Sequence, residues 1–139
     1  MRLLFVLLLF PSIAFADCVS SLLESGYRVE RLAPFKDGSC GISDPVRMYA
    51  TPTTDFSSPI TLSCPFTKRV GDWAFDIGAK HIAHIGGYNC RKVRGGFMMS
   101  QHSYGNAIDV KKIDGVPISK QWRHAYKRAC KYFSTVRTP

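Results

Sequence analysis

The segment from Ser100 to Ile118, SQHSYGNAIDVKKIDGVPI, contains the clearest indications of the fold. It predicts a strand over residues 106–111, a turn at Asp114-Gly115 and a second strand over residues 116–118. Ser119 is then expected to cap a final helix, because a serine oxygen accepts from free amides at a helix start. One apolar stripe of that helix recurs at helical spacing: Trp122, Ala125, Tyr126, Ala129, Cys130 and Phe133.

The chain before this hairpin predicts further helices and strands. Asp17 can cap a short helix over residues 18–25. The apolar–charged alternation over residues 27–32 predicts a half-buried strand. Pro65 suits the first turn of a helix that apolar spacing extends to about residue 80. Residues 81–90 are apolar and rich in glycine, which predicts a strand entering a turn.

Two regions are expected to be mostly irregular. Residues 34–63 contain repeated prolines and predict loops, with short extended pieces at 46–49 and 60–62. Residues 93–104 predict a further loop. The helices and short strands do not alternate regularly, so the predicted class is α+β, with a small antiparallel sheet flanked by helices.

The first sixteen residues have the pattern of a cleavable signal peptide. Arg2 precedes an apolar run over residues 3–10, and Ala14 and Ala16 supply the small residues of a cleavage site. Eight apolar residues are too few to span a bilayer, which takes about 20. We therefore expect cleavage after Ala16, a secreted or periplasmic protein without a membrane span, and a single domain over residues 17–139.

The charge of the chain favours acidic partners. The formal net charge is +9, and removal of the signal segment with Arg2 lowers it to +8. An exported basic domain suits peptidoglycan or another acidic envelope polymer, or lipid head groups. A solvated basic surface without a partner is the plainer alternative. No nucleic-acid-binding motif is present, so nucleic acid is not an expected partner and remains the weakest hypothesis.

The same quoted segment contains two residues suited to zinc. His102 offers an imidazole and Asp109 a carboxylate, and Gly105 allows a sharp turn between them. Alone, a His and an Asp seven residues apart carry little information. They lie, however, within the longer pattern Ser-x-His-x-x-Gly-x-Ala-x-Asp.

This pattern resembles the signature of the zinc D-alanyl-D-alanine peptidases and their relatives, among them the lysostaphin-type endopeptidases and the hedgehog signalling domain. The closer resemblance is to the extensin-like C-terminal domain family of exported bacterial proteins. Its further motifs, in the same order, are Cys40-Gly-Ile-x-x-Pro45-Val-Arg, Leu62-Ser-Cys64, Trp73, Gly87-Tyr-Asn-Cys90-Arg91, Asp114-Gly115 and Ala129-Cys130-x-x-Phe133. The resemblance implies the fold shared by these peptidases and hedgehog domains.

The resemblance also implies a site. His102 and Asp109 align with two zinc ligands, and Arg91 with the arginine that faces the substrate and the developing oxyanion. Ser100 is expected to support the ligand loop rather than to act as a nucleophile. Family members usually supply a third ligand from a His-x-His element beyond the equivalent of Pro139. We therefore expect a domain that is incomplete, or truncated, at its C-terminal end.

Other histidines are weaker candidates for the third ligand. His81 and His84 would share a helix face but point to opposite faces of a strand, and a strand is predicted there. His124 lies beside the basic faces of the last helix, where exposure to solvent is expected. Arg91 also has a plainer interpretation, as one surface cation among 19 Lys and Arg residues.

Five cysteines in a short exported chain predict one or two disulfides and one free thiol. Cys18 and Cys40 could join the first helix to the following loop. Cys130, on the apolar stripe, could reach Cys64 and leave Cys90 beside Arg91. Many other pairings remain open.

Two hypotheses for function follow. The first is a zinc-dependent amide hydrolase of the cell envelope, a metallopeptidase that acts on peptidoglycan peptides by activating water at the metal. The second is a non-catalytic module of the same fold that binds acidic envelope polymer through its basic surface. Intact metal ligation favours the first, and salt-dependent binding without metal favours the second.

Overall fold

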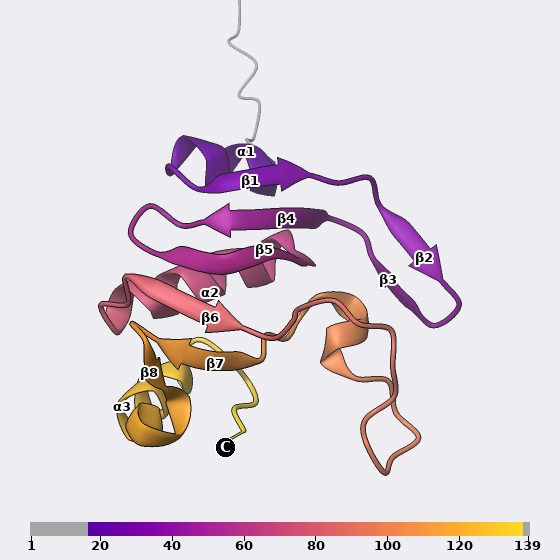
Figure 1. Cartoon of the computed structure of the whole chain (residues 1–139). Helices are drawn as coiled ribbons and strands as arrows, with labels where there is room; N and C mark the ends of the chain where they lie inside the picture. Colours follow the sequence, from indigo (N-terminus) through magenta and orange to yellow (C-terminus); the bar gives the residue numbers. More distant parts are fainter. Residues whose placement is uncertain (1–16, 138–139) are drawn as a thin grey trace, which may run out of the picture.

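The computed structural model describes residues 17–137, so the predicted signal segment lies outside the described residues. Within that range the chain is α+β, as predicted (Figure 1). The helices are α1 (Cys18–Glu24), α2 (Cys64–Asp76), the 3-10 helix η1 (Gln101–Tyr104) and α3 (Ile118–Ala129). The strands are β1 (Arg28–Arg31), β2 (Phe35–Asp37), β3 (Cys40–Ile42), β4 (Pro45–Ala50), β5 (Asp55–Ser63), β6 (His81–His84), β7 (Val110–Ile113) and β8 (Val116–Pro117).

The main sheet has the strand order β1-β4-β5-β6-β7-β8, and β2 and β3 form a separate hairpin. The neighbouring strands pair antiparallel except for β5 and β6, which are parallel and are connected through α2. The prediction of a small antiparallel sheet is therefore wrong in two respects, because the sheet is mixed and larger. A helical crossover such as α2 is the usual way for a chain to join parallel neighbours.

Helices α2 and α3 cover one face of this sheet, and α2 lies behind β5 and β6 in Figure 1. Val70, Trp73 and Ala74 of α2 pack there against the inward side chains of the strands. Those inward side chains are Met48, Phe56, Ile60, Leu62, Ile82 and Ile113. The shared burial of apolar area fixes which face of each strand points to the helices.

The opposite face of the sheet carries polar side chains. Glu30 accepts hydrogen bonds there from Arg47 at 3.3 Å and from the Tyr49 hydroxyl at 3.0 Å. Ile108 and Val110 both pack against the core. Since side chains alternate along an extended chain, Asp109 points to the polar face.

Two helix starts follow the capping rules. The Asp17 carboxylate accepts from the Ser20 amide at 2.8 Å and from the Arg31 guanidinium. These contacts, with the backbone hydrogen bond first, lower the pKa of Asp17 to about 2. Ser63 caps α2, accepting from the Phe66 amide at 3.4 Å.

Several element boundaries differ from the predictions. Residues 34–63 contain four strands rather than two short extended pieces, and the strand expected over 81–90 ends at His84. Helix α3 begins at Ile118 after Pro117, so Ser119 is not its cap. On α3 the stripe is only partly buried: Ala125 and Ala129 are in the core, whereas Cys130 is exposed.

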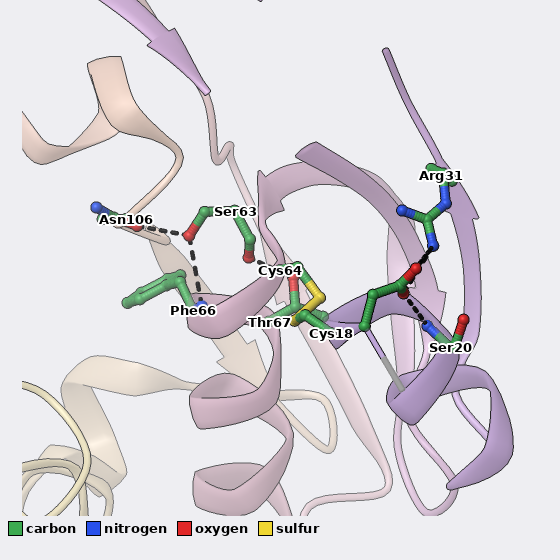
Figure 2. Close-up of a disulfide and its surroundings, with 9 residues drawn as sticks. Cys18, Ser20, Arg31, Ser63, Cys64, Phe66, Thr67 and Asn106 are labelled. Carbon is green, nitrogen blue, oxygen red and sulfur yellow. Dashed lines mark hydrogen bonds and ion pairs between the residues drawn. A yellow bond between two sulfur atoms is a disulfide. The ribbon is translucent and has the colours of Figure 1, made fainter. Parts of the chain in front are cut away.

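The predicted disulfide pairing is wrong. Cys18 is bonded to Cys64 and Cys40 to Cys90, whereas Cys130 is a free, exposed cysteine. The first bond ties the start of α1 to the start of α2 (Figure 2). The exposure of Cys130 removes the reason for pairing it with Cys64.

The two disulfides are consistent with a secreted protein, because such bonds persist in oxidising compartments. In the part of the chain that the structure describes, no helix is long and apolar enough to cross a membrane.

Tyr27 joins α1 to the rest of the core. Its side chain is buried against α2, where a Cβ at Gly71 would overlap the Tyr27 ring. Burial, followed in importance by the charge of Asp72, raises the pKa of Tyr27 to about 12. The neutral phenol is therefore favoured in the folded state.

This raised pKa predicts a loss of stability in alkali. The folded pKa of Tyr27 lies above the unfolded value near 10. The stabilisation of the folded state by the neutral Tyr27 phenol is therefore complete below pH 10 and is lost as the pH rises through about 12. We expect the free energy of unfolding to fall by about 1–2 kcal/mol over this interval relative to Tyr27→Phe. Urea unfolding of both proteins at pH 9–12 measures the difference, and parallel pH profiles would contradict it.

Candidate functional site

His102 and Asp109 meet on the polar face of the sheet. The His102 Nε2 atom lies 3.4 Å from Asp109 Oδ2. His102 is 8% exposed, whereas the Asp109 side chain is 50% exposed. The pair is therefore anchored in the protein on the histidine side and open to solvent on the carboxylate side.

The orientation of the His102 ring is fixed by a backbone carbonyl. His102 Nδ1 lies 2.6 Å from the Gly87 oxygen. A carbonyl can only accept, so Nδ1 donates, and a neutral ring then has its free lone pair on Nε2. Metal-binding histidines commonly donate their second nitrogen to such a carbonyl.

The separation of the two side chains fits a shared metal ion better than a direct bond. A charge-assisted hydrogen bond between them would be about 2.7–2.9 Å long. Two ligands of a tetrahedral zinc ion, each about 2.0–2.2 Å from the metal, lie about 3.4 Å apart. The distance from Nε2 to Oδ2 is 3.4 Å, so the nitrogen and oxygen donors can occupy two corners of such a site.

Gly105 allows the chain to return from His102 to Asp109. It adopts a left-handed conformation, with φ of 67°, at the end of η1. A Cβ there would lie 2.6 Å from the Ser63 nitrogen, and the Gly105 oxygen accepts from that same amide at 2.9 Å. The turn therefore rests directly on the junction between β5 and α2.

Two serines shape the segment around His102. Ser100 caps η1 by accepting from the His102 amide at 3.3 Å, which matches its expected supporting role. The Ser103 hydroxyl accepts from the Arg91 amide at 3.0 Å and donates to the Arg91 carbonyl at 2.9 Å. The backbone of Arg91 is thus fixed to the residue that follows His102.

Arg91 itself is exposed, and it follows the disulfide between Cys40 and Cys90. These contacts hold its main chain beside the His102 segment. The direction of its guanidinium toward a substrate stays a prediction from the family resemblance.

A groove of about 360 Å³ lies between β5 and the chain that follows β6. Ser58–Thr61 line one side and His84–Tyr88 the other. Gly87 belongs to this lining and also accepts the hydrogen bond from His102. The groove therefore borders the His102 side of the pair.

The other histidines do not join His102. His84 lies in β6, as the predicted strand implies, and its Nε2 donates to the Ser58 carbonyl at 2.9 Å. His81 and His124 are exposed. Among residues 17–137, the cluster of three residues of metal-binding type comprises Cys18, Asp44 and Cys64, but its two cysteines are bonded to each other.

Residue patterns did not identify Gly87 and Ser103 as parts of the site. Gly87 acts through its carbonyl, and a Cβ there would overlap Ile60 and Leu62 of β5. The only signal in the sequence is the pair Gly86-Gly87, which could have suggested a close approach of two backbones. Nothing in the spacing of Ser103 indicates its contacts with Arg91.

The comparisons with known proteins identify the family. Residues 16–139 match the family described as extensin-like protein C-terminus, so the chain belongs to that family. Neither the comparison with curated proteins nor the comparison with solved structures gave a match.

The turn at Gly105 predicts a specific sensitivity to a methyl group. Gly105→Ala combines a left-handed backbone with the overlap at Ser63, so we expect the free energy of unfolding to fall by about 3 kcal/mol or more. Gly95→Ala is the matched control, because Gly95 has a φ of 75° and open space around it. Its cost should be about 1–2 kcal/mol.

Chemical denaturation of both variants measures this difference. The NMR chemical shifts of the His102 ring should change in Gly105→Ala and stay unchanged in Gly95→Ala. Equal losses of stability, with an unperturbed His102 in both variants, would show that the contact at Ser63 does not constrain the turn.

Proposed function

We propose that this domain is a zinc-dependent amide hydrolase of the cell envelope that acts on peptidoglycan peptides. The observation that carries the proposal is the His102–Asp109 pair, with Nε2 and Oδ2 3.4 Å apart and Nδ1 engaged by Gly87. The family resemblance adds the identity of the metal and the class of substrate.

His102 and Asp109 would supply one nitrogen and one oxygen ligand. The Gly87 carbonyl holds His102 in the tautomer that leaves Nε2 free, and the left-handed turn at Gly105 lies between His102 and Asp109. A catalytic zinc site generally uses three protein ligands. In the proposal the third comes from a His-x-His element, which residues 1–139 do not contain.

A bound zinc ion would supply Lewis-acid activation of water and polarisation of an amide carbonyl. Arg91 would bind the negative charge that develops on the carbonyl oxygen, for which a guanidinium offers two parallel donors. Its backbone is already ordered by Ser103, so the conformational freedom lost on binding there is that of the side chain alone. The bordering groove would hold an extended peptide beside the pair.

A second candidate function is supported by the charge of the chain. The exposed residues Arg91, Lys92 and Arg94 follow one another closely, and no acidic residue occurs between Asp76 and Asp109. Such a surface suits a non-catalytic module that binds an acidic envelope polymer. Binding of isolated sacculi that persists in EDTA and weakens steeply with salt would favour this function over hydrolysis.

The metal proposal predicts weak zinc binding by the two-ligand chain. We expect competition with a chromophoric chelator to detect one readily removed zinc ion per chain. His102→Ala or Asp109→Ala should weaken the affinity at least tenfold, whereas the exposed His124→Ala should not. Extension through a His-x-His element should tighten binding at least tenfold. Equal affinities for all three variants and the parent would contradict the proposed ligands.

The role of Arg91 is tested in the extended chain. Arg91→Lys keeps the charge but loses the bidentate fork. We expect the release of soluble muropeptides from sacculi to slow at least tenfold. Liquid chromatography with mass spectrometry measures this release. The zinc affinity should stay unchanged. Hydrolysis at the parent rate would assign Arg91 to the surface, and no zinc-dependent release by the parent would reject the hydrolase.

A further inference from the structure

The loop from Arg91 to Ser100, called here the 91–100 loop, exposes the most accessible large apolar side chain described. Phe97 is 95% exposed, and the adjacent Met98 is 78% exposed. Single apolar residues on a surface need no explanation. Two adjacent ones at the end of a projecting loop form a small apolar tip. Exposure of this tip to water is unfavourable, and binding to an apolar partner would remove that cost.

The 91–100 loop is an ordered hairpin. The Ser100 amide donates to the Arg91 carbonyl at 2.9 Å, and the Val93 amide donates to the Met98 carbonyl at 2.8 Å. A bridge pairs Lys92 with Met99. The hairpin projects away from the sheet between β6 and η1, in the orange part of the chain in Figure 1.

The base of the hairpin is fixed to the domain. Cys90, immediately before Arg91, is bonded to Cys40 of β3, and Ser103 holds both backbone groups of Arg91. The apolar tip is thus presented by a tethered base rather than by a free segment. Such preorganisation lowers the entropy that has to be lost when a surface is bound.

The charges around the tip have one sign. Arg91, Lys92 and Arg94 are exposed, and the whole stretch between Asp76 and Asp109 lacks an acidic residue. An acidic polymer would neutralise these cations but leave Phe97 and Met98 in water. An anionic lipid surface accommodates both groups, since its head groups attract Lys and Arg and its acyl boundary accepts apolar side chains.

We propose that the 91–100 loop docks the domain on an anionic lipid bilayer, with Phe97 and Met98 entering the boundary between head groups and acyl chains. The loop lies on the surface and does not span the membrane. Lys92 and Arg94 contact the lipid phosphates, and their aliphatic stems extend from the apolar tip to the charged layer. The inference is independent of zinc binding and of hydrolysis.

Vesicle binding tests the proposal. The chain from residue 17, with its disulfides intact, is sedimented with vesicles of 30% phosphatidylglycerol in phosphatidylcholine, and with pure phosphatidylcholine. We expect binding to the anionic vesicles only. The double variant Phe97→Ser/Met98→Ser should lower the partition coefficient at least tenfold, and so should Lys92→Ser/Arg94→Ser.

Phe75→Ser is the matched control. Phe75 is 70% exposed but lies at the end of α2 beside Asp76, so its loss should leave binding unchanged. Thermal unfolding of each variant verifies that the fold is kept. An effect of Phe75→Ser equal to that of the double variant would overturn the assignment to the 91–100 loop.

Fluorescence separates insertion from charge attraction alone. The indole introduced by Phe97→Trp should shift its emission to shorter wavelength on anionic vesicles and be quenched by brominated acyl chains, whereas that of Phe75→Trp should do neither. The proposal is overturned if the parent does not bind anionic vesicles, or if the emission of Phe97→Trp stays unquenched. It is also overturned if Phe97→Ser/Met98→Ser abolishes binding to sacculi but not to vesicles, which would assign the tip to the polymer.

Discussion

The hydrogen bonds at the junction of β5 and α2 hold together parts of the chain that are far apart in sequence. The Ser63 amide donates to the Gly105 carbonyl at 2.9 Å, and the Ser63 hydroxyl donates to Asn106 at 2.6 Å. The Cys64 amide donates to the Asp44 carbonyl at 2.8 Å, while its sulfur is bonded to Cys18. Figure 2 shows the hydrogen bond between Ser63 and Asn106 and the disulfide between Cys18 and Cys64. The turn that joins the two candidate ligands is therefore hydrogen-bonded directly to the start of α2.

The parts of the fold that sequence predicts are those decided locally. The Asp17 cap and the turn at Asp114-Gly115 depend on neighbouring residues, and both are present in the structure. Within residues 34–63 the extended pieces expected at 46–49 and 60–62 lie inside the longer strands β4 and β5, whereas the hairpin of β2 and β3 is not predicted, because such proline-rich segments become strands only by pairing with one another. Likewise, the parallel pairing of β5 with β6 depends on the packing of α2 and leaves no local signature.

The candidate site follows the same division. The resemblance of the segment around His102 and Asp109 to the Ser-x-His-x-x-Gly-x-Ala-x-Asp pattern implies that the two side chains converge, and their Nε2 and Oδ2 atoms lie 3.4 Å apart. The carbonyl that orients the imidazole belongs to Gly87, fifteen residues earlier, so only the tertiary fold identifies it. The disulfide pairing was mispredicted for a related reason, since the distance between cysteines along a chain does not determine their distance in space.

The two disulfides interlace, which has a consequence for the biogenesis of the protein. In chain order the bonded cysteines are Cys18, Cys40, Cys64 and Cys90, and the bonds join the first to the third and the second to the fourth. An oxidase that joined thiols in the order of their synthesis would first link Cys18 to Cys40, and neither would then have its native partner. Native maturation therefore requires that oxidation wait for α2 to dock, or that an isomerase exchange the early bond by thiolate attack.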